Sequence, residues 1–398
     1  MQTPMSLMQG APAAPKDQVT LANWREPGFG RWSFSHIRQL LPTAPIAPAS
    51  SPAPMARAIE DLAAVPIMHD GAASFSLDGF LRHSQTDAYL VMHRGKLVYE
   101  WYDGFGSADR QHIVFSVSKS ITALLAGVLV GQGVLHPDQM VADILPETKG
   151  SAYDGATVRN VLDMTVSSGF VEDYLDTTGV FMAYRRASAW NPLEEGTSTD
   201  GLRAFLAALP AGDGNHGHQH DYCSPHSDLL GWLLERVAGQ SFASLLSTLI
   251  AHPTGLTHEA YVTLDSYGAP RVAGGICVTP IDLVRLAEMV RCGGAANGRQ
   301  VVPESWITDF TTYDNDAAWQ RQKEGPRLFD RGCYRSKWYR TGHADDEYCA
   351  IGIHGQWIWV NPKRDISIVR LASADLPLNS EMDRVLLSAF DATCQALA

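Results

Sequence analysis

Hydrophobic and polar residues follow a pattern that changes from alternating to helical early in the chain. Two apolar and aromatic runs, 89–92 and 97–101, flank Arg94-Gly95, and this arrangement predicts a β-hairpin over 88–102. Apolar residues then recur at helical spacing as far as Gly131 or Gly133, where a glycine suits a helix C-cap. The sequence therefore predicts a helix, starting close to Ser116, directly after a piece of sheet.

The middle of the chain, from 137 to about 239, shows helices and long loops with few alternating β-branched residues. A short amphipathic pattern over 158–164 and a longer one that Gly239 closes predict two of these helices. Between them lies an irregular segment, 171–195. Loops of that length in a compact protein are more often functional than idle.

Alternation returns in the last third of the chain. Thr279-Pro280 supplies an N-cap and a first-turn proline for a helix that ends at Gly293-Gly294. Strands are predicted over 348–360 and 366–371, and a terminal helix over 381–397. Strands near both ends with a helical middle predict an α/β domain assembled from two separate parts of the chain.

Domain boundaries follow from this order of elements. We expect residues 1–55 to form an arm packed on the body, 56–135 and 240–398 to form a discontinuous α/β domain, and 136–239 to form a mostly α-helical domain. The arm is rich in proline between 42 and 54, which excludes a helix there, while its aromatic residues favour packing over disorder.

Composition and charge narrow the classes of function. The 398 residues are 45% hydrophobic and 19% charged, as in a soluble globular protein, and the net charge of −12 argues against nucleic acid or an anionic membrane as a partner. The longest apolar stretch, 121–130, is too short to span a bilayer, and residues 1–20 lack the pattern of a secretory signal. We therefore expect a cytoplasmic protein whose six cysteines, none in a Cys-x-x-Cys pair, are reduced.

Ser116 and Lys119 stand three residues apart at the start of the predicted helix, so their side chains share one face within one turn. A serine hydroxyl is nearly inert at neutral pH, and a lysine that the core partly desolvates can accept its proton. At a helix N-terminus the N–H of Ser116 can also face a developing oxyanion. A Ser-x-x-Lys pattern by itself is more often an ordinary helix start capped by a serine. It indicates catalysis only if other parts of the chain supply further active-site residues.

Two further stretches supply such partners. Tyr222 precedes the helix that Gly239 closes, and it can act as a phenolate if a nearby ammonium lowers its pKa; the alternative is a core tyrosine. His354-Gly355-Gln356 lies inside the predicted strand 348–360. Glycine in a strand often marks close approach of a ligand, and the N–H of Gln356 can supply a second oxyanion donor; the alternative is a β-bulge.

In this order, these stretches resemble the active-site motifs of the serine β-lactamase and penicillin-binding-protein superfamily, in its class C-like branch. Ser116-Val117-Ser118-Lys119 matches the Ser-x-x-Lys box, Tyr222-Cys223-Ser224 the Tyr-x-Asn box and His354-Gly355 the Lys-Thr-Gly box. The resemblance implies an α/β plus all-α architecture of the β-lactamase/DD-peptidase-like fold, with an antiparallel sheet flanked by helices and a helical insertion.

The chain is also similar to the 6-aminohexanoate-dimer (nylon-oligomer) hydrolases and the carboxylesterases close to them, through 23–27, 172–174 and 351–356. This resemblance implies that Tyr174 contacts the substrate amide nitrogen from a loop over the site. The remaining candidates for substrate binding are Ser224, His354, Gly355 and Glu172. Glu172, with Asp173 and Asp176, either meets a substrate ammonium or is a solvated loop charge.

Two departures argue against a dedicated β-lactamase. Ile353 stands where β-lactamases have the third-box lysine, which removes the cation that would pair with a β-lactam carboxylate. Ser224 stands where they have an asparagine.

Three alternating histidines, His216, His218 and His220, look like a metal tract in a glycine-rich loop. Such histidines are more often solvated or hydrogen-bonded than metal-bound, and the chemistry described above needs no metal. We expect no metal and no cofactor, and we place this segment along the cleft next to Tyr222.

The sequence thus predicts a serine hydrolase that cleaves a linear amide of the 6-aminohexanoate-oligomer type, or a short ester, through an acyl-enzyme. Ser116 attacks, Lys119 or Tyr222 acts as the base, and the N–H groups of Ser116 and Gln356 hold the oxyanion. The alternatives are a carboxylesterase of the same family without useful amidase activity and a catalytically silent member that only binds a ligand. The small-molecule substrate is the one partner expected, with a homodimer left open.

Overall fold

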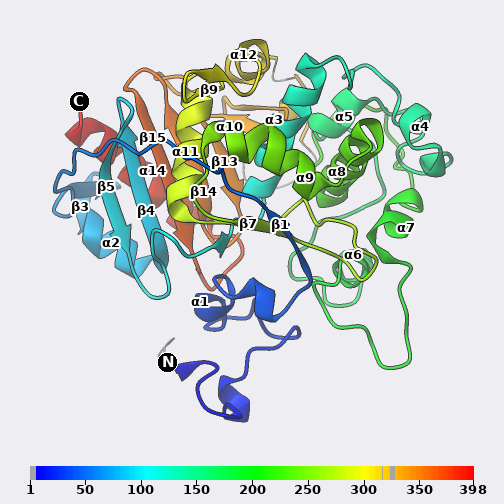
Figure 1. Cartoon of the computed structure of the whole chain (residues 1–398), viewed down its shortest axis with the longest axis horizontal. Helices are drawn as coiled ribbons and strands as arrows, with labels where there is room; N and C mark the ends of the chain where they lie inside the picture. Colours follow the sequence, from blue (N-terminus) through cyan, green and yellow to red (C-terminus); the bar gives the residue numbers. More distant parts are fainter. Residues whose placement is uncertain (1–5, 316, 323–327) are drawn as a thin grey trace.

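A seven-stranded antiparallel sheet joins the two ends of the chain in this computed structural model, which describes residues 6–315, 317–322 and 328–398. The strand order is β11-β12-β13-β14-β15-β4-β5, and the pairing of β15 with β4 brings the C-terminal strands against the predicted hairpin, which is confirmed (Figure 1). The strands are β4 (Thr86–His93), β5 (Lys96–Tyr102), β11 (Cys333–Arg335), β12 (Trp338–Arg340), β13 (Tyr348–Gly352), β14 (Gln356–Asn361) and β15 (Ile366–Ala372).

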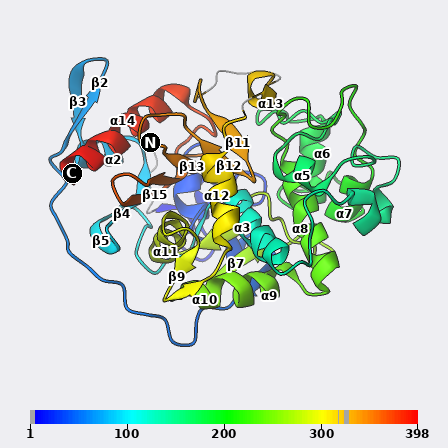
Figure 2. The same ribbon diagram turned by 90° about the horizontal axis from the view of Figure 1, so that it is seen from above.

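Helices cover both faces of this sheet. Helix α11 (Pro280–Arg291) packs on one face, and α2 (Leu77–His83) and α14 (Ser380–Ala396) pack on the other (Figure 2). Successive side chains of a strand point to opposite faces. In β4, Leu90 therefore joins the core under α11 while its neighbour Tyr89 joins the core under α14, and both are fully buried.

A smaller antiparallel sheet lies next to the first, in the order β1-β7-β8-β6. Its strands are β1 (Thr43–Ile46), β6 (His112–Ile113), β7 (Ala260–Thr263) and β8 (Ile276–Val278). The strand β1 was not predicted, because its segment is rich in proline. It forms at the edge of the sheet, where Pro45 needs to donate no ladder hydrogen bond.

The helical part of the chain surrounds α3 (Val117–Gly131) and α8 (Ser224–Ala238) (Figure 1). Gly239, with φ of 63°, ends α8 in a left-handed C-cap, as predicted. Helices α4 (Val141–Ile144), α5 (Val158–Leu162), α6 (Val180–Ala187) and α7 (Gly201–Ala207) come from the middle segment, and the domain boundaries 136 and 239 stay a prediction.

The other elements connect or flank these layers. No helix of the described ranges is both long enough and apolar enough to cross a bilayer. The connecting elements are η2 (Pro15–Asp17), α1 (Gly30–Ser33), η3 (Ile37–Gln39), β2 (Pro66–His69), β3 (Ala72–Ser76), η4 (Pro146–Thr148), α9 (Phe242–Leu246), η5 (Ser247–Ala251), α10 (His252–Thr254), β9 (Ala295–Ala296), β10 (Arg299–Gln300), α12 (Glu304–Thr312) and α13 (Ala317–Gln320).

One predicted strand, 348–360, is two strands in the structure. It folds into the hairpin β13–β14, in which Gly352 pairs with Gln356 across a turn. His354 and Gly355 have φ of 60° and 86°, and this left-handed backbone cannot continue a strand. The third sequence motif therefore lies in a turn and not inside a strand.

Candidate active site

Ser116 is held at the N-terminus of α3 by a strained residue in an aromatic cluster. Phe115 has φ of 42°, a conformation that costs a non-glycine residue on the order of 1–3 kcal/mol. Its ring packs against the rings of Trp24, Phe34 and Trp190, with centroids 4.9 to 6.2 Å apart. The N-terminal arm, which carries Trp24 and Phe34, thus helps to position Ser116.

Lys119 lies against the Ser116 hydroxyl. Its Nζ donates to Ser116 Oγ at 2.7 Å and to the carbonyl oxygen of Ala273 at 2.7 Å. Burial lowers the Lys119 pKa to about 8, against the opposing effect of the Glu172 carboxylate. At that pKa roughly a tenth of the lysine is neutral at pH 7 and able to accept a proton.

A buried ion pair holds the backbone of Ala273, whose carbonyl oxygen accepts from Lys119. Asp228 Oδ1 accepts from the N–H of Ala273 at 2.7 Å, and Oδ2 pairs with Arg271 and accepts from the Tyr184 hydroxyl. Sequence reasoning missed this group because Asp228 and Arg271 are 43 residues apart and neither belongs to a motif. Asp228 thereby positions Lys119 through the backbone of Ala273.

Tyr222 lies on the other side of Lys119, with Nζ 5.1 Å from the centroid of the tyrosine ring. Burial raises the Tyr222 pKa well above its ordinary value, helped by Tyr339 and Glu172 and opposed by hydrogen bonding with Ser116. This differs from the expected phenolate: the cost of burying an anion exceeds the effect of the nearby ammonium. Tyr222 is therefore a neutral hydroxyl next to Ser116.

Glu172 ties the loop over the site to the start of α8. Its Oε1 accepts from the hydroxyls of Tyr174 and Ser224 at 2.7 Å each, and Oε2 accepts from the N–H of Ser224. A carboxylate at a helix N-terminus is stabilised by the helix dipole. Asp173 and Asp176 instead accept N–H groups within their own exposed loop, so of the three acidic residues Glu172 alone lines the site.

Two cavities meet at Ser116, one of about 660 Å³ and one of about 20 Å³. Glu172, Tyr174 and Ile353 line both of them, while Tyr222 lines the larger and Lys119 and Ser224 line the smaller. The larger cavity has mainly aromatic and apolar walls, to which Phe170, Trp319, Leu328, Phe329 and Tyr339 contribute. The structure thus brings six of the predicted site residues together around one serine: Ser116, Lys119, Tyr222, Tyr174, Glu172 and Ser224.

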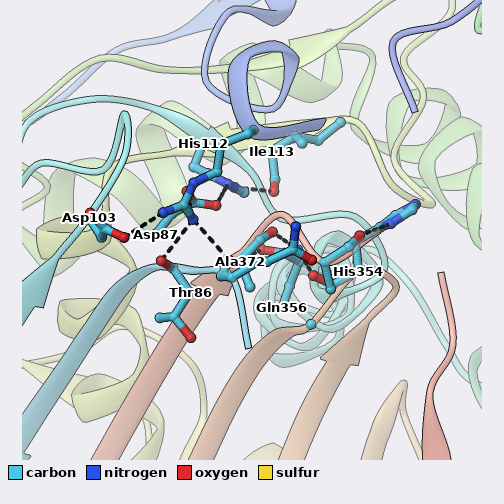
Figure 3. A network of polar contacts seen from close by, with 12 residues as sticks. Thr86, Asp87, Asp103, His112, Ile113, His354, Gln356 and Ala372 are labelled. Atoms are coloured by element: carbon cyan, nitrogen blue, oxygen red, sulfur yellow. Dashed lines mark hydrogen bonds and ion pairs between the residues drawn. The ribbon is translucent and has the colours of Figure 1, made fainter. Parts of the chain in front are cut away.

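His354, Gly355 and Gln356 lie beside the site and line neither cavity. His354 is 3% exposed, with Nδ1 2.7 Å from the carbonyl oxygen of Ala374, and Gly355 accepts from Arg370. The Gln356 carboxamide hydrogen-bonds both backbone groups of Ala372 (Figure 3). None of the three has the contact with a cavity that was expected of it, because the turn at His354 and Gly355 leaves Gly352 and Ile353 at the cavity wall instead.

The end of β13 takes their place at the cavity wall. A Cβ added to Gly352 would stand 3.1 Å from the nitrogen of Ser116 and 2.7 Å from the carbonyl oxygen of Val114. Only a glycine lets the strand pass this close to the helix N-terminus. Ile353, the next residue, was not predicted as a site residue, although the glycine before it marked a close approach.

The alternating histidines do not converge on one point. His216 Nδ1 accepts from the N–H of Ser167 at 3.1 Å, whereas His220 packs between the rings of Trp319 and Tyr334 on the wall of the larger cavity. In the described part of the chain, no three His, Cys, Asp or Glu side chains are arranged to hold a metal ion.

Comparison with known proteins places this geometry in a family. The Beta-lactamase family model matches residues 77–390. A 6-aminohexanoate-dimer hydrolase from Paenarthrobacter ureafaciens is 33% identical over 91% of this chain and 90% of its own, and esterase EstB from Burkholderia gladioli is 26% identical over 44% of this chain and 47% of its own.

Solved structures agree with the sequence relatives. A Bacillus anthracis structure described as a candidate 6-aminohexanoate-dimer hydrolase superposes with a TM-score of 0.87, at 22% identity, over 96% of this chain and 98% of its own. The β-lactamase-like fold expected from the motifs is therefore confirmed. The chain belongs to the β-lactamase family of serine hydrolases, among the relatives of the 6-aminohexanoate-dimer hydrolases.

Proposed function

We propose that this chain is a serine amidase and esterase that works through an acyl-enzyme on Ser116. The observation that carries the proposal is the 2.7 Å contact between Lys119 Nζ and Ser116 Oγ, made by a lysine whose pKa is about 8. A neutral amine in contact with a hydroxyl at the wall of a 660 Å³ cavity is the arrangement that activates a serine nucleophile.

The proton follows a short route in this mechanism. Neutral Lys119 takes the Ser116 proton as Oγ attacks the substrate carbonyl, and Tyr222 gives its hydroxyl proton to the leaving group and regains one from Lys119. Water then attacks the ester formed on Ser116, loses a proton to Lys119, and releases the acid as Ser116 is reprotonated. We assign the oxyanion to the N–H groups of Ser116 and Ile353, with Ile353 in the role expected of Gln356.

We propose a linear amide of the 6-aminohexanoate-oligomer class as the substrate, with short esters also accepted. A relative that is 33% identical over 91% of this chain is named 6-aminohexanoate-dimer hydrolase. Tyr174 lines both cavities, which supports giving it the contact with the leaving nitrogen, and Ile353 offers no charge for a β-lactam carboxylate.

A panel of three substrates tests this assignment: a short p-nitrophenyl ester, the linear 6-aminohexanoate dimer and a cephalosporin. We expect clear ester hydrolysis, measurable dimer hydrolysis and weak or no cephalosporin turnover. Tyr174→Phe should depress kcat/KM for the dimer far more than for the ester, because only the amide needs its leaving nitrogen oriented and protonated.

Tyr267→Phe is the matched control, since this tyrosine is 69% exposed and its hydroxyl donates to the carbonyl of Thr199. Equal losses on ester and dimer in Tyr174→Phe would refute the role of Tyr174. A cephalosporin as the best substrate would overturn the substrate class.

A further inference from the structure

The smaller cavity beside Ser116 is lined by three guanidinium groups. Arg25 comes from the N-terminal arm, Arg185 from α6 and Arg271 from the loop before β8, and they share this cavity with Ser116 and Lys119. At about 20 Å³ it has room for a small group such as one carboxylate or one or two water molecules.

The charges around this cavity do not balance. Asp228 neutralises Arg271 in a buried ion pair. Glu172, an acidic side chain of the wall, accepts from the neutral donors Tyr174 and Ser224 and favours the charged forms of Arg185 and Arg271. The three guanidinium groups therefore face two carboxylates, Glu172 and Asp228. Arg25 and Arg185 have no ion pair with any carboxylate in the described part of the chain.

Both unpaired guanidiniums are held in place by neutral groups. Arg25 donates to the carbonyl oxygen of Trp190 and to Asn191 Oδ1, and its Cζ lies 4.7 Å from the centroid of Trp24. Arg185 donates to the carbonyl oxygen of Tyr174 at 2.9 Å, and its Cζ lies 4.2 Å from the centroid of Phe181. A guanidinium stacked and bonded in this way is pre-organised for a planar anion.

Two observations show that this positive charge lacks compensation. The Nε of Arg185 is buried and has no hydrogen-bond partner within the described residues. Burial and the charges of Arg185 and Arg271 lower the pKa of Arg25 well below its ordinary value. An anion in the cavity would add negative charge beside Arg25 and Arg185.

We propose that this cavity receives a carboxylate of the substrate, so that the enzyme prefers amides and esters that carry a free carboxylate over their neutral counterparts. The proposal rests on the proposed function, because it assumes that Ser116 is acylated. Arg185 and Arg25 then determine substrate specificity, because their guanidinium groups form charge-assisted hydrogen bonds to the carboxylate.

Matched pairs of esters test the proposal. In one pair the acyl part is a short dicarboxylic acid, with its distal carboxylate free or methylated; in the other the leaving phenol carries a carboxylate or its methyl ester. We expect the free acid of one pair to have a kcat/KM at least roughly 10-fold above its neutral partner, and the pair that shows this preference identifies the side of the substrate that the cavity binds.

Arg185→Gln should reduce this ratio of anionic to neutral kcat/KM roughly 10-fold, and Arg185→Lys should restore part of it. Arg25→Gln is the second variant, and thermal unfolding checks that each variant is folded. The control is Arg186→Gln on the same helix, whose guanidinium pairs with Glu194 and lines neither cavity, and which should leave the ratio unchanged.

Two results would overturn the carboxylate subsite: no preference for the free acid in either pair, or an unchanged ratio in folded Arg185→Gln and Arg25→Gln. Hydrolysis of the neutral esters reports separately on the proposed function. If the neutral and the anionic esters are all inert, the proposed function fails and the subsite fails with it.

Discussion

At the residue scale, Lys119 shows how burial lowers the affinity of a lysine for its proton. A lysine in water is almost wholly protonated at pH 7, whereas at 2% exposure the Lys119 pKa falls to about 8. Glu172 limits the fall, since its negative charge favours the ammonium. Burial and the Glu172 charge together set the fraction of Lys119 that is neutral at a given pH.

This balance predicts the pH dependence of the reaction. Because neutral Lys119 is the active form, kcat/KM should rise with pH and level off above an apparent pKa near 8. Glu172→Gln removes the charge that raises the Lys119 pKa and keeps one acceptor oxygen for Ser224, so the rising limb of the pH profile should move to lower pH. The check is a pH profile of kcat/KM on a neutral ester, with Glu147→Gln, whose side chain pairs with Arg236, as the surface control.

If the rising part of the kcat/KM pH profile stays in place or moves to higher pH in Glu172→Gln, the assignment of Lys119 as the base is contradicted. This result would favour another group as the proton acceptor.

At the element scale, we infer that the end of β13 sets the geometry of the proposed oxyanion site. Gly352→Ala would bring a Cβ 2.7 Å from the carbonyl oxygen of Val114 and 3.1 Å from the nitrogen of Ser116, closer than ordinary contact. We expect the strand to shift and kcat to fall by roughly 10²-fold, the size of a lost oxyanion donor. Steady-state kinetics and a urea titration together separate this loss from a loss of stability.

Gly79→Ala in α2 is the control, since its Cβ would meet one hydroxyl at 3.2 Å in an element outside the site. A Gly352→Ala enzyme with unchanged kcat would show that this strand end does not define the oxyanion geometry.

The elements also show what the sequence could predict. Residues three apart on a helix lie on the same face, so the contact between Ser116 and Lys119 was predictable. The order of the three sequence motifs predicted that Tyr222 belongs to the same site, and it lines the same cavity as Ser116. The hairpin β13–β14 was not predictable from alternation, because a three-residue turn that contains one glycine also fits a continuous strand. That turn moved Gln356 out of the site and Ile353 into it.

At the scale of the whole molecule, contacts far apart in sequence decide what the pattern leaves open. The large sheet combines strands from both ends of the chain, as the sequence predicted, whereas the strand order around β15 and β4 was not predicted. The pairing of β1 with β7 and the Asp228–Arg271 pair depend on tertiary contacts, and no local pattern signals them. The same holds for Arg25 and Arg185, which meet only in the folded protein.

Buried histidines predict the acid stability of the fold. Burial lowers the pKa of His220 to about 3 and of His354 to about 4, and it lowers the pKa of His226 well below its ordinary value. The unfolded chain binds protons at these sites below about pH 6.5 and the folded chain does not, so stability is lost as pH falls. Each histidine lowers the free energy of unfolding by about 1.4 kcal/mol per pH unit in that range.

Urea titrations between pH 7.5 and 5 should show this decline. Asp383, whose pKa burial raises to about 6, opposes it below that pH. His354→Asn tolerates the left-handed backbone and should flatten the slope by about one proton. A slope equal to that of the unsubstituted protein would mean that His354 is not a buried neutral group.

In the proposed mechanism Ser116 is a nucleophile activated by Lys119, and covalent labelling tests this activation. The protein is incubated with a fluorophosphonate at pH 8 and its intact mass and labelled peptide are measured, beside Ser116→Ala and Lys119→Ala. We expect one adduct on Ser116, none in Ser116→Ala, and labelling slowed on the order of 10²-fold in Lys119→Ala. An unlabelled Ser116 in the folded protein, or labelling at the full rate without Lys119, would contradict the proposed mechanism.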